Sequence, residues 1–128
     1  MFRKPVTFDE FVRFVMWEID RGRINRHWRP QYDICAPCYI NYDYYCYYET
    51  IQQDASYIVD RIAAGSNVTF PLGELGSRVP NSQEYLRLFD EVSVSSIRRI
   101  LDLYRNDYSV FGYKIPDRIQ RRLSQAAR

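Results

Sequence analysis

Apolar residues recur every three or four positions along several stretches of the chain, which is the spacing of one face of a helix. Before the first stripe lies Thr7-Phe8-Asp9-Glu10, a capping box in which the Thr7 hydroxyl and the Glu10 carboxylate satisfy backbone amides at a helix start. The pattern predicts a helix that begins at Phe8 and that Asp20-Arg21-Gly22 ends. Its core-facing stripe consists of Phe8, Phe11, Val12, Val15, Met16 and Ile19.

A second capping box, Thr50-Ile51-Gln52-Gln53, opens the next helical stretch. This helix is predicted to run to a glycine stop at Gly65. Its apolar positions at helical spacing are Ile51, Ala55, Ile58 and Ile62. Residues 66–80 are rich in proline and glycine, so we expect an exposed loop there.

Helical spacing returns in the C-terminal third of the chain. Asn81-Ser82-Gln83-Glu84 resembles a helix cap and leads to a short helix through Phe89. A longer helix is predicted from about Val94 to about Asp107. Its buried stripe consists of Ile97, Ile100, Leu101 and Tyr104. Residues 114–128 either form a short amphipathic helix on Ile115, Ile119 and Leu123 or fray.

The periodicity disappears between Arg23 and Pro37, where Pro30 and Pro37 push the residues before them towards extended geometry. We expect an irregular loop over this range. Residues 39–48 have the aromatic density of a strand, and their apolar pattern is nearly continuous rather than alternating. This predicts a buried strand at Cys38–Tyr42.

Length and composition favour one folded domain or a piece of one. The chain has 128 residues, of which 46% are hydrophobic and 27% charged, a balance typical of a folded chain rather than a disordered one. A formal charge of +2 is too small to indicate nucleic acid as a partner. No run approaches the ~20 apolar residues that span a bilayer, and the N-terminus lacks the apolar region of a signal peptide.

Arginine dominates two basic clusters. The first flanks His27 and consists of Arg21, Arg23, Arg26 and Arg29. The second occupies the last fifteen residues and consists of Lys114, Arg118, Arg121, Arg122 and Arg128. Guanidinium groups pair bidentately with sulfate, carboxylate or phosphate, which suggests an anionic partner. A solvated face followed by a disordered tail explains the same charges, and the sequence leaves both interpretations open.

The cysteines suggest a metal site. Cys35-x-x-Cys38, together with His27 and Cys46, matches the ligand count of a Cys3His zinc site. His27 and Cys46 each stand alone in the sequence, whereas structural zinc sites usually use two pairs of closely spaced ligands. A redox role is less supported, because no helix directly follows the two cysteines to stabilise a thiolate.

His27 is the only histidine, and it lies in the predicted loop rather than on an apolar stripe. Imidazole is the side chain most easily poised to take a proton from a hydroxyl near neutral pH, although a lone histidine is more often structural. Aromatic hydroxyls nearby are suited to a sugar ring or to the rim of a buried strand. They belong to Tyr39, Tyr42, Tyr44, Tyr45, Tyr47 and Tyr48. No glycine pattern of a phosphate-binding loop is present.

A series of motifs stands in one order along the chain. They are Thr7-Phe8-Asp9-Glu10-Phe11, His27-Trp28, Cys35-Ala36-Pro37-Cys38, Tyr42-Asp43, Glu49-Thr50 with Asp54, and the closing run from Tyr104 to Tyr113. Together they resemble the C-terminal part of the Golgi carbohydrate sulfotransferases, enzymes that sulfate chondroitin, dermatan and related glycans. Two positions depart from that pattern. Asn25 stands where the family usually has Asp, and Cys46 stands where Gly is more common.

The resemblance implies an α/β, P-loop-like sulfotransferase fold. Residues 1–113 would be its helix-rich C-terminal portion, and residues 114–128 a basic tail. It implies 3′-phosphoadenylyl sulfate (PAPS) as donor and a glycosaminoglycan or another glycan as acceptor. It also implies a Golgi-lumenal enzyme that contacts the membrane only through an anchor. We expect the anchor and the donor-binding motifs upstream of Met1.

The same resemblance assigns roles to residues. His27 is expected to be catalytic, as a base or as an orienter of the sugar hydroxyl. The acceptor-binding residues would be Arg26, Trp28, Arg29, Tyr42 and Asp43. No residue of this chain is expected to bind the donor or a metal.

Passage through the secretory pathway would add two modifications. Asn67, in the sequon Asn67-Val68-Thr69, would carry a glycan. Cys35 or Cys38 would be disulfide-bonded, either directly in a strained bridge or to a cysteine upstream of Met1. The alternative is a non-enzymatic, zinc-stapled module that binds acidic glycans through Arg21, Arg23, Arg26 and Arg29.

Overall fold

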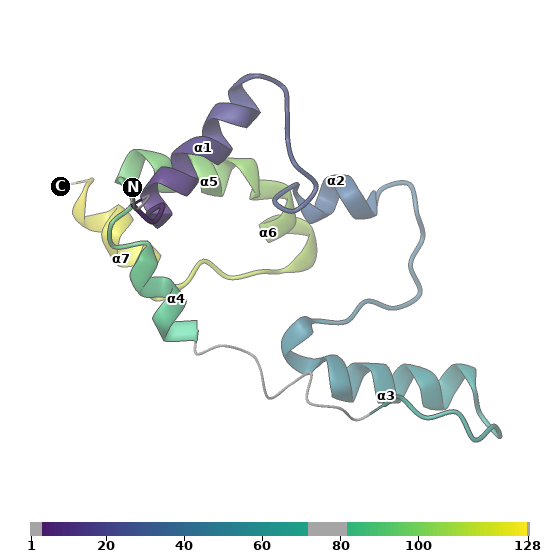
Figure 1. Cartoon of the computed structure of the whole chain (residues 1–128). Coiled ribbons are helices and arrows are strands. Elements are labelled where there is room, and N and C mark those ends of the chain that lie inside the picture. The colour runs from purple at the N-terminus through teal and green to yellow at the C-terminus, as the bar shows by residue number, and fades with distance from the viewer. Residues whose placement is uncertain (1–3, 72–81, 128) are drawn as a thin grey trace. The chain divides into compact units, whose positions relative to one another are not determined.

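The computed structural model describes residues 4–71 and 82–127, and every regular element in those ranges is a helix (Figure 1). The chain divides into two compact units. The larger unit contains Met1–Ile40 and Gln83–Arg128, and the smaller unit contains Asn41–Ser82. The helix-rich part of the predicted fold class is therefore confirmed, whereas its strand component does not occur in the described part of the chain.

Helix α1 (Phe8–Asp20) confirms the first capping box. The Glu10 N–H donates to the Thr7 hydroxyl at 3.2 Å, and the Thr7 N–H donates to the Glu10 carboxylate at 2.9 Å. These reciprocal bonds satisfy amides that a helix start leaves without a partner. Three residues of the predicted stripe, Val12, Val15 and Met16, are buried, whereas Phe11 is 39% exposed.

The core of the larger unit gathers residues from four segments. Its buried residues are Val12, Val92, Ile97 and Ile119. Half-buried aromatic and aliphatic side chains, including Phe8, Phe89, Ile100 and Leu123, pack around them. Because α1 and α5 (Val94–Leu103) contact one another directly, the N-terminal and C-terminal parts of the chain form one core.

The helix predicted over 94–107 is interrupted. Ser93 caps α5, accepting from the Ser96 N–H at 3.1 Å, and the helix ends at Leu103. Tyr104 leaves helical geometry at ψ 14°, and α6 (Arg105–Phe111) then continues the chain. The predicted end near Asp107 was wrong, because one break divides the stretch into two helices. Gly112, at φ 69°, ends α6 in a left-handed conformation that glycine adopts without strain.

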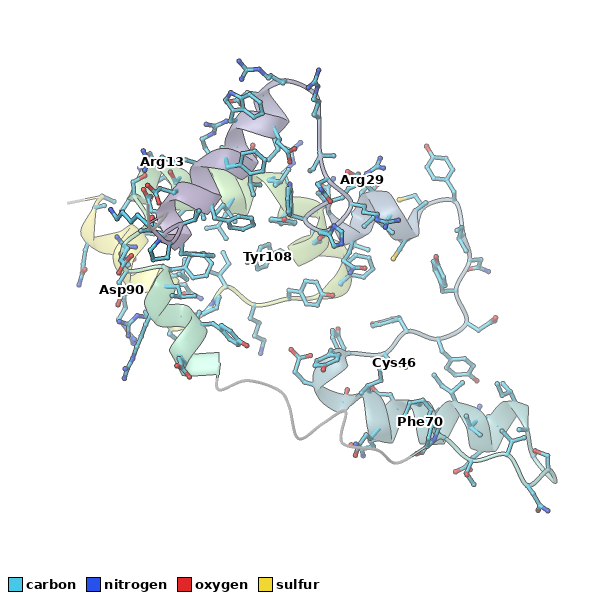
Figure 2. The ribbon with its side chains drawn as sticks, viewed as in Figure 1. Arg13, Arg29, Cys46, Phe70, Asp90 and Tyr108 are labelled. Atoms are coloured by element: carbon cyan, nitrogen blue, oxygen red, sulfur yellow. The ribbon has the colours of Figure 1, made fainter. Side chains whose placement is uncertain are left out.

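The helical alternative for the C-terminal segment is the observed one. Helix α7 (Asp117–Gln125) buries Ile119, while Ile115 and Leu123 pack against the core. The guanidinium of Arg122 donates to the carbonyls of Phe89 and Val92, just after α4 (Ser82–Leu88). Arg118 forms an ion pair with Asp90, which Figure 2 labels near this contact.

The smaller unit contains a single-turn 3₁₀ helix (Tyr48–Thr50) and α3 (Ile51–Ile62). The predicted helix is confirmed, but its capping box is not formed. Thr50 makes no side-chain bond to the helix amides and donates instead to the Asp54 carboxylate. No residue of α3 is buried, and Ile62 is 73% exposed.

Two predictions about residues 23–42 were wrong. The loop contains a short helix, α2 (Gln31–Cys35), because Pro30 presets the geometry at its start and a distant carboxylate satisfies its first amides. Cys38–Tyr42 is an exposed turn rather than a buried strand. Ala36, at φ 45°, reverses the chain, and its carbonyl accepts from the Tyr39 and Ile40 amides.

The loop predicted over 66–80 is described only to Pro71, where it is irregular and mainly exposed. The cap predicted at Asn81 lies outside the described residues, although the helix that follows is present as α4. Among the described helices, none is both long enough and apolar enough to cross a bilayer.

Candidate functional site

Trp28 anchors the loop that carries His27. Its indole Nε1–H donates to the Glu18 carboxylate at 3.0 Å, and its ring meets Phe11 edge-on at 5.5 Å between centroids. Both partners lie on α1, so the tryptophan fixes the loop to the core helix. This contact explains why the residue is half-buried.

Helix α6 and the residue before it hold the same loop from the other side. The Tyr104 hydroxyl donates to the Trp28 carbonyl at 2.6 Å. The two carboxylate oxygens of Asp107 accept from the N–H groups of Gln31 and Tyr32, each at 2.8 Å. Asp107 is 4% exposed, so this carboxylate replaces water as the acceptor for the first amides of α2.

Burial also affects the tyrosines beside Asp107. Partial desolvation, and then the nearby Asp107 charge, raise the pKa of Tyr104 and of Tyr108 above the usual value. Both phenols therefore stay protonated around neutral pH. The Tyr104 hydroxyl is thus a stable donor to the Trp28 carbonyl.

His27 is exposed, and its ring is oriented by Asn25. The backbone N–H of His27 donates to Asn25 Oδ1 at 3.0 Å, which fixes that atom as the amide oxygen. The ring Nδ1 lies 2.8 Å from the same oxygen. An amide oxygen only accepts, so Nδ1–H is the donor in this contact, and in the neutral tautomer that it favours the lone pair lies on Nε2. Asn25 therefore orients the imidazole without a negative charge.

The arginines of this loop differ in their surroundings. The Arg21 guanidinium lies over the Trp17 ring, 4.1 Å from its centroid, in a cation–π contact. Arg26 and Arg29 are exposed, and neither forms an ion pair within the described ranges. Figure 2 shows Arg29 beside α2. These two guanidinium groups are therefore available to an external anion.

A cavity of about 300 Å³ opens beside Arg29. Its lining comes from the end of the His27 loop, from α2 and from the turn after it, namely Arg29, Tyr32, Asp33, Ala36, Cys38 and Tyr39. The Tyr32 hydroxyl lies 3.2 Å from Cys38 Sγ. This hydrogen bond, followed by the Cys38 charge, raises the pKa of Tyr32.

No disulfide joins Cys35, Cys38 and Cys46. The Cys35 thiol donates within α2 to the Gln31 side chain at 3.4 Å, and Cys46 belongs to the smaller unit. In the ranges that the structure describes, no three His, Cys, Asp or Glu side chains come together as metal ligands. The zinc-stapled alternative therefore has no geometric support. A bond to a cysteine outside this sequence stays a prediction.

The predicted site residues fall into two groups. Arg26, His27, Trp28 and Arg29 lie in one loop of the larger unit. Tyr42 and Asp43 are exposed residues of the smaller unit, so they stay predictions with no geometric link to His27. Asn67 is exposed in the loop after α3, and its glycosylation stays a prediction.

Sequence reasoning gave no role at the site to Asp107, Tyr104, Tyr32 or Asp33. Tyr104 and Asp107 lie in the closing motif, and that motif was the only available signal. Periodicity assigned Tyr104 to a buried stripe. It could not show that the hydroxyl reaches a carbonyl 76 residues away in the chain.

Comparison with known proteins identifies the class. The model of the Sulfotransferase family matches residues 3–114. Carbohydrate sulfotransferase 14 of Danio rerio is 39% identical over 113 residues, covering 88% of this chain and 30% of that protein. Carbohydrate sulfotransferase 10 of Gallus gallus is 32% identical over 120 residues, covering 89% of this chain and 34% of that protein.

The chain therefore belongs to the sulfotransferase family, and the relatives it matches are carbohydrate sulfotransferases. Carbohydrate sulfotransferase 14 of Homo sapiens is 34% identical over 113 residues, covering 88% of this chain and 30% of that protein. The chain thus spans about a third of the length of these curated relatives. No solved structure matches it.

Proposed function

We propose that this chain is the acceptor-side part of a carbohydrate sulfotransferase, which transfers sulfate from PAPS to a glycan hydroxyl. The family match over residues 3–114 supports the reaction class. The observation that carries the proposal is the oriented imidazole. Asn25 holds Nδ1–H, so the exposed ring of His27 presents Nε2 as a base. Arg26 and Arg29 place positive charge in the same loop.

The chemistry is an in-line displacement at sulfur. Nε2 of His27 takes the proton of the sugar hydroxyl as its oxygen forms a bond to sulfur. The bond from sulfur to the donor's phosphate oxygen breaks, and 3′-phosphoadenosine 5′-phosphate leaves with that electron pair. Trp28, held by Glu18 and Tyr104, keeps the loop in place rather than touching the sugar. Arg26 and Arg29 bind anionic groups of the acceptor.

The donor is assigned to a part of the enzyme outside the described residues. Phosphosulfate groups are commonly held at an open helix N-terminus or a glycine-rich loop. The starts of α1, α2 and α5 are satisfied by Thr7 with Glu10, by Asp107 and by Ser93, whereas those of α3 and α7 have no side-chain cap. No glycine-rich phosphate loop accompanies these two starts, and we assign none of the described residues to PAPS. Calorimetry with 3′-phosphoadenosine 5′-phosphate should detect no micromolar binding to the isolated chain, and such binding would contradict this assignment.

The fold, compartment and acceptor proposed for the complete enzyme are those that the family resemblance implies. The complete enzyme would have a P-loop-like α/β fold, act in the Golgi lumen on a glycosaminoglycan or another glycan, and contact the membrane through an anchor outside this sequence. Residues 1–113 would belong to the catalytic domain. In that compartment Asn67 would be glycosylated, and Cys35 or Cys38 would form a disulfide. A glycosidase-sensitive mass that disappears in Asn67→Gln checks the first modification.

The test of function is a transfer assay on the intact protein that contains this chain, purified from a eukaryotic secretory host. Radiolabelled PAPS is offered with desulfated chondroitin, desulfated dermatan and a neutral N-acetylglucosamine oligomer. We expect label in at least one anionic glycan. Label in none of them, from a folded protein that binds the donor, would contradict the proposal.

A further inference from the structure

We propose that the apolar cavity beside Trp28 binds one small neutral aromatic ring, and that this ring stabilises the loop that carries His27. The cavity lies within the larger unit and has a volume of about 160 Å³. Its walls come from α1, from α5, from the His27 loop and from the residues that directly follow α4 and α5. The site is separate from the acceptor and donor chemistry proposed above, so the two proposals stand or fall independently.

The cavity extends from the protein surface into the core of the larger unit. Val12, Val15 and Met16 line it, and all three are buried. Phe11 also lines it and is 39% exposed. The cavity therefore opens to solvent beside Phe11 and has core residues at its inner end. A guest inside it would exchange water for packed apolar side chains.

The lining gives a guest no charged side chain and few polar groups. Of the residues that line the cavity, all of which the structure describes, only Trp28 and Tyr104 carry a side-chain N–H or O–H. The Trp28 Nε1–H donates to Glu18, and the Tyr104 hydroxyl donates to the Trp28 carbonyl, so both donors are already used. A buried water molecule needs several polar partners, and an ion needs a compensating charge. The cavity thus favours a neutral apolar guest.

The volume and the walls fit one six-membered aromatic ring. An apolar protein cavity of about 150 Å³ stays dry and binds benzene. Two pairs of lining rings meet edge-on, Phe8 with Phe89 at 5.0 Å and Phe11 with Trp28 at 5.5 Å between centroids. A further aromatic ring can add edge-to-face contacts of the same kind, which an aliphatic guest cannot make.

Two of the lining residues also hold the His27 loop. Trp28 follows His27 directly, and its indole and its carbonyl are bonded to Glu18 and Tyr104. A guest that packs against the Trp28 ring is bound only while Trp28 stays in this position. Its binding free energy is therefore added to the stability of that arrangement. The site offers a way to stabilise the loop without contact to the imidazole, which does not line the cavity.

An NMR titration of the 128-residue chain with benzene tests the site. The chain has two tryptophans, and the variant Trp17→Phe assigns their indole N–H signals. We expect the Trp28 signal to shift saturably with a Kd of about 1 mM, because so small a ligand makes few contacts, and the Trp17 signal to shift less. Pyrimidine has a ring of the same size with two acceptor nitrogens. It should bind at least about tenfold more weakly, because those nitrogens lose their hydrogen bonds to water.

Two variants of α5 separate binding in the cavity from binding elsewhere. Ile100→Phe places a larger side chain in the cavity and should weaken benzene binding about tenfold or more. Leu101→Phe changes the next residue, which packs against the core but does not line the cavity. It should alter benzene binding less than about twofold.

Hydrogen exchange tests the link to the loop. With benzene at about ten times its Kd, exchange of the Trp28 indole N–H should slow about tenfold, because exchange then requires a state that cannot bind the guest. The amide of Ile58 in α3, which belongs to the smaller unit, should exchange at an unchanged rate. Binding without slower exchange at Trp28 would overturn the effect on the His27 loop.

A saturable shift that is selective for benzene, lost in Ile100→Phe and kept in Leu101→Phe, would support the site. Absence of a saturable shift at Trp28, equal binding of benzene and pyrimidine, or equal weakening by the two α5 variants would each overturn it. If Ile100→Phe does not fold, the contrast between benzene and pyrimidine at Trp28 decides. None of these measurements depends on sulfate transfer.

Discussion

Helices α1 and α3 look alike in the sequence and differ in the structure. Both follow a Thr-x-x-Glu or Thr-x-x-Gln motif, and both carry an apolar stripe at helical spacing. Helix α1 forms its cap and buries Val12, Val15 and Met16. Helix α3 forms no such cap and buries none of its residues. All the buried side chains among the described residues belong to the larger unit.

The difference lies in contacts between segments far apart in the sequence. In the larger unit, α1 packs against α5, Asp107 caps α2, and Arg122 reaches the carbonyls that follow α4. Amphipathic periodicity shows which face of a helix can be buried but not what buries it. Most helical stability comes from tertiary packing, so only the larger unit contains helices that packing visibly stabilises.

The largest expected effect is on the core. Ile97→Ala should lower the free energy of unfolding by about 3 kcal/mol, because Ile97 is 1% exposed and the variant leaves a cavity. The matched change Ile58→Ala in α3 should cost less than about 1 kcal/mol. Urea unfolding followed by circular dichroism measures both. Equal losses would mean that α3 is buried in solution and would remove the contrast between the units.

His27→Ala sharpens the contrast between packed and exposed residues of the larger unit. The proposed function predicts that turnover of the intact enzyme falls by roughly 10²-fold, the contribution of a general base. The thermal midpoint should stay within about a degree, since His27 is exposed and contacts only its neighbours. Asn25→Ala should reduce turnover less than His27→Ala does. Asn25→Asp should keep the turnover of the unmodified enzyme, because its carboxylate also accepts from Nδ1–H. Normal turnover in folded His27→Ala would end the role of His27 as base.

Asp107→Asn tests the long-range cap. An amide presents one acceptor oxygen in place of two, so one buried N–H of Gln31 or Tyr32 loses its partner. We expect a loss of about 2 kcal/mol and faster hydrogen exchange at those two amides. Asp102→Asn, which removes only an exposed ion pair with Arg105, should leave both measurements nearly unchanged. Unchanged exchange in Asp107→Asn would show that water satisfies these amides.

Local signals predicted most of the helices. The spacing of apolar residues predicted α1 together with the Thr7 box and α3 together with the Thr50 box, and spacing alone predicted α5 and the helical alternative for α7. Short-range sequence could not predict α2, because its five residues are stabilised by Asp107 from the other end of the chain. The aromatic run after Cys38 was mistaken for a strand, since aromatic density fits an exposed turn as well as a buried sheet.

The site was predictable only where its residues are adjacent in sequence. His27 and Arg29 stood out because they are chemically distinctive members of one loop. The partners that hold this loop are Glu18, Tyr104 and Asp107, ordinary residue types on other helices. No sequence pattern within the loop indicates that these three residues contact it. Tyr42 and Asp43 were grouped with His27 by the resemblance alone, and their place relative to it stays untested.

The smallest expected effect is the loss of stability when the threonine of either capping box is replaced. Thr7→Ala should lower stability by about 1 kcal/mol, because its hydroxyl accepts from the Glu10 N–H. Thr50→Ala should cost less, since Thr50 makes no cap bond.

The hydrogen bonds from the Thr7 backbone and hydroxyl hold the pKa of Glu10 below its usual value. The folded-state pKa is lower than the unfolded one, so this stabilisation is present above the unfolded pKa and is lost as pH falls through the folded one. Thermal midpoints from pH 7 to pH 3 should therefore decline less steeply in Glu10→Gln than in the unmodified chain. Parallel declines, or equal costs at Thr7 and Thr50, would show that the α1 box is no better formed in solution than the α3 one.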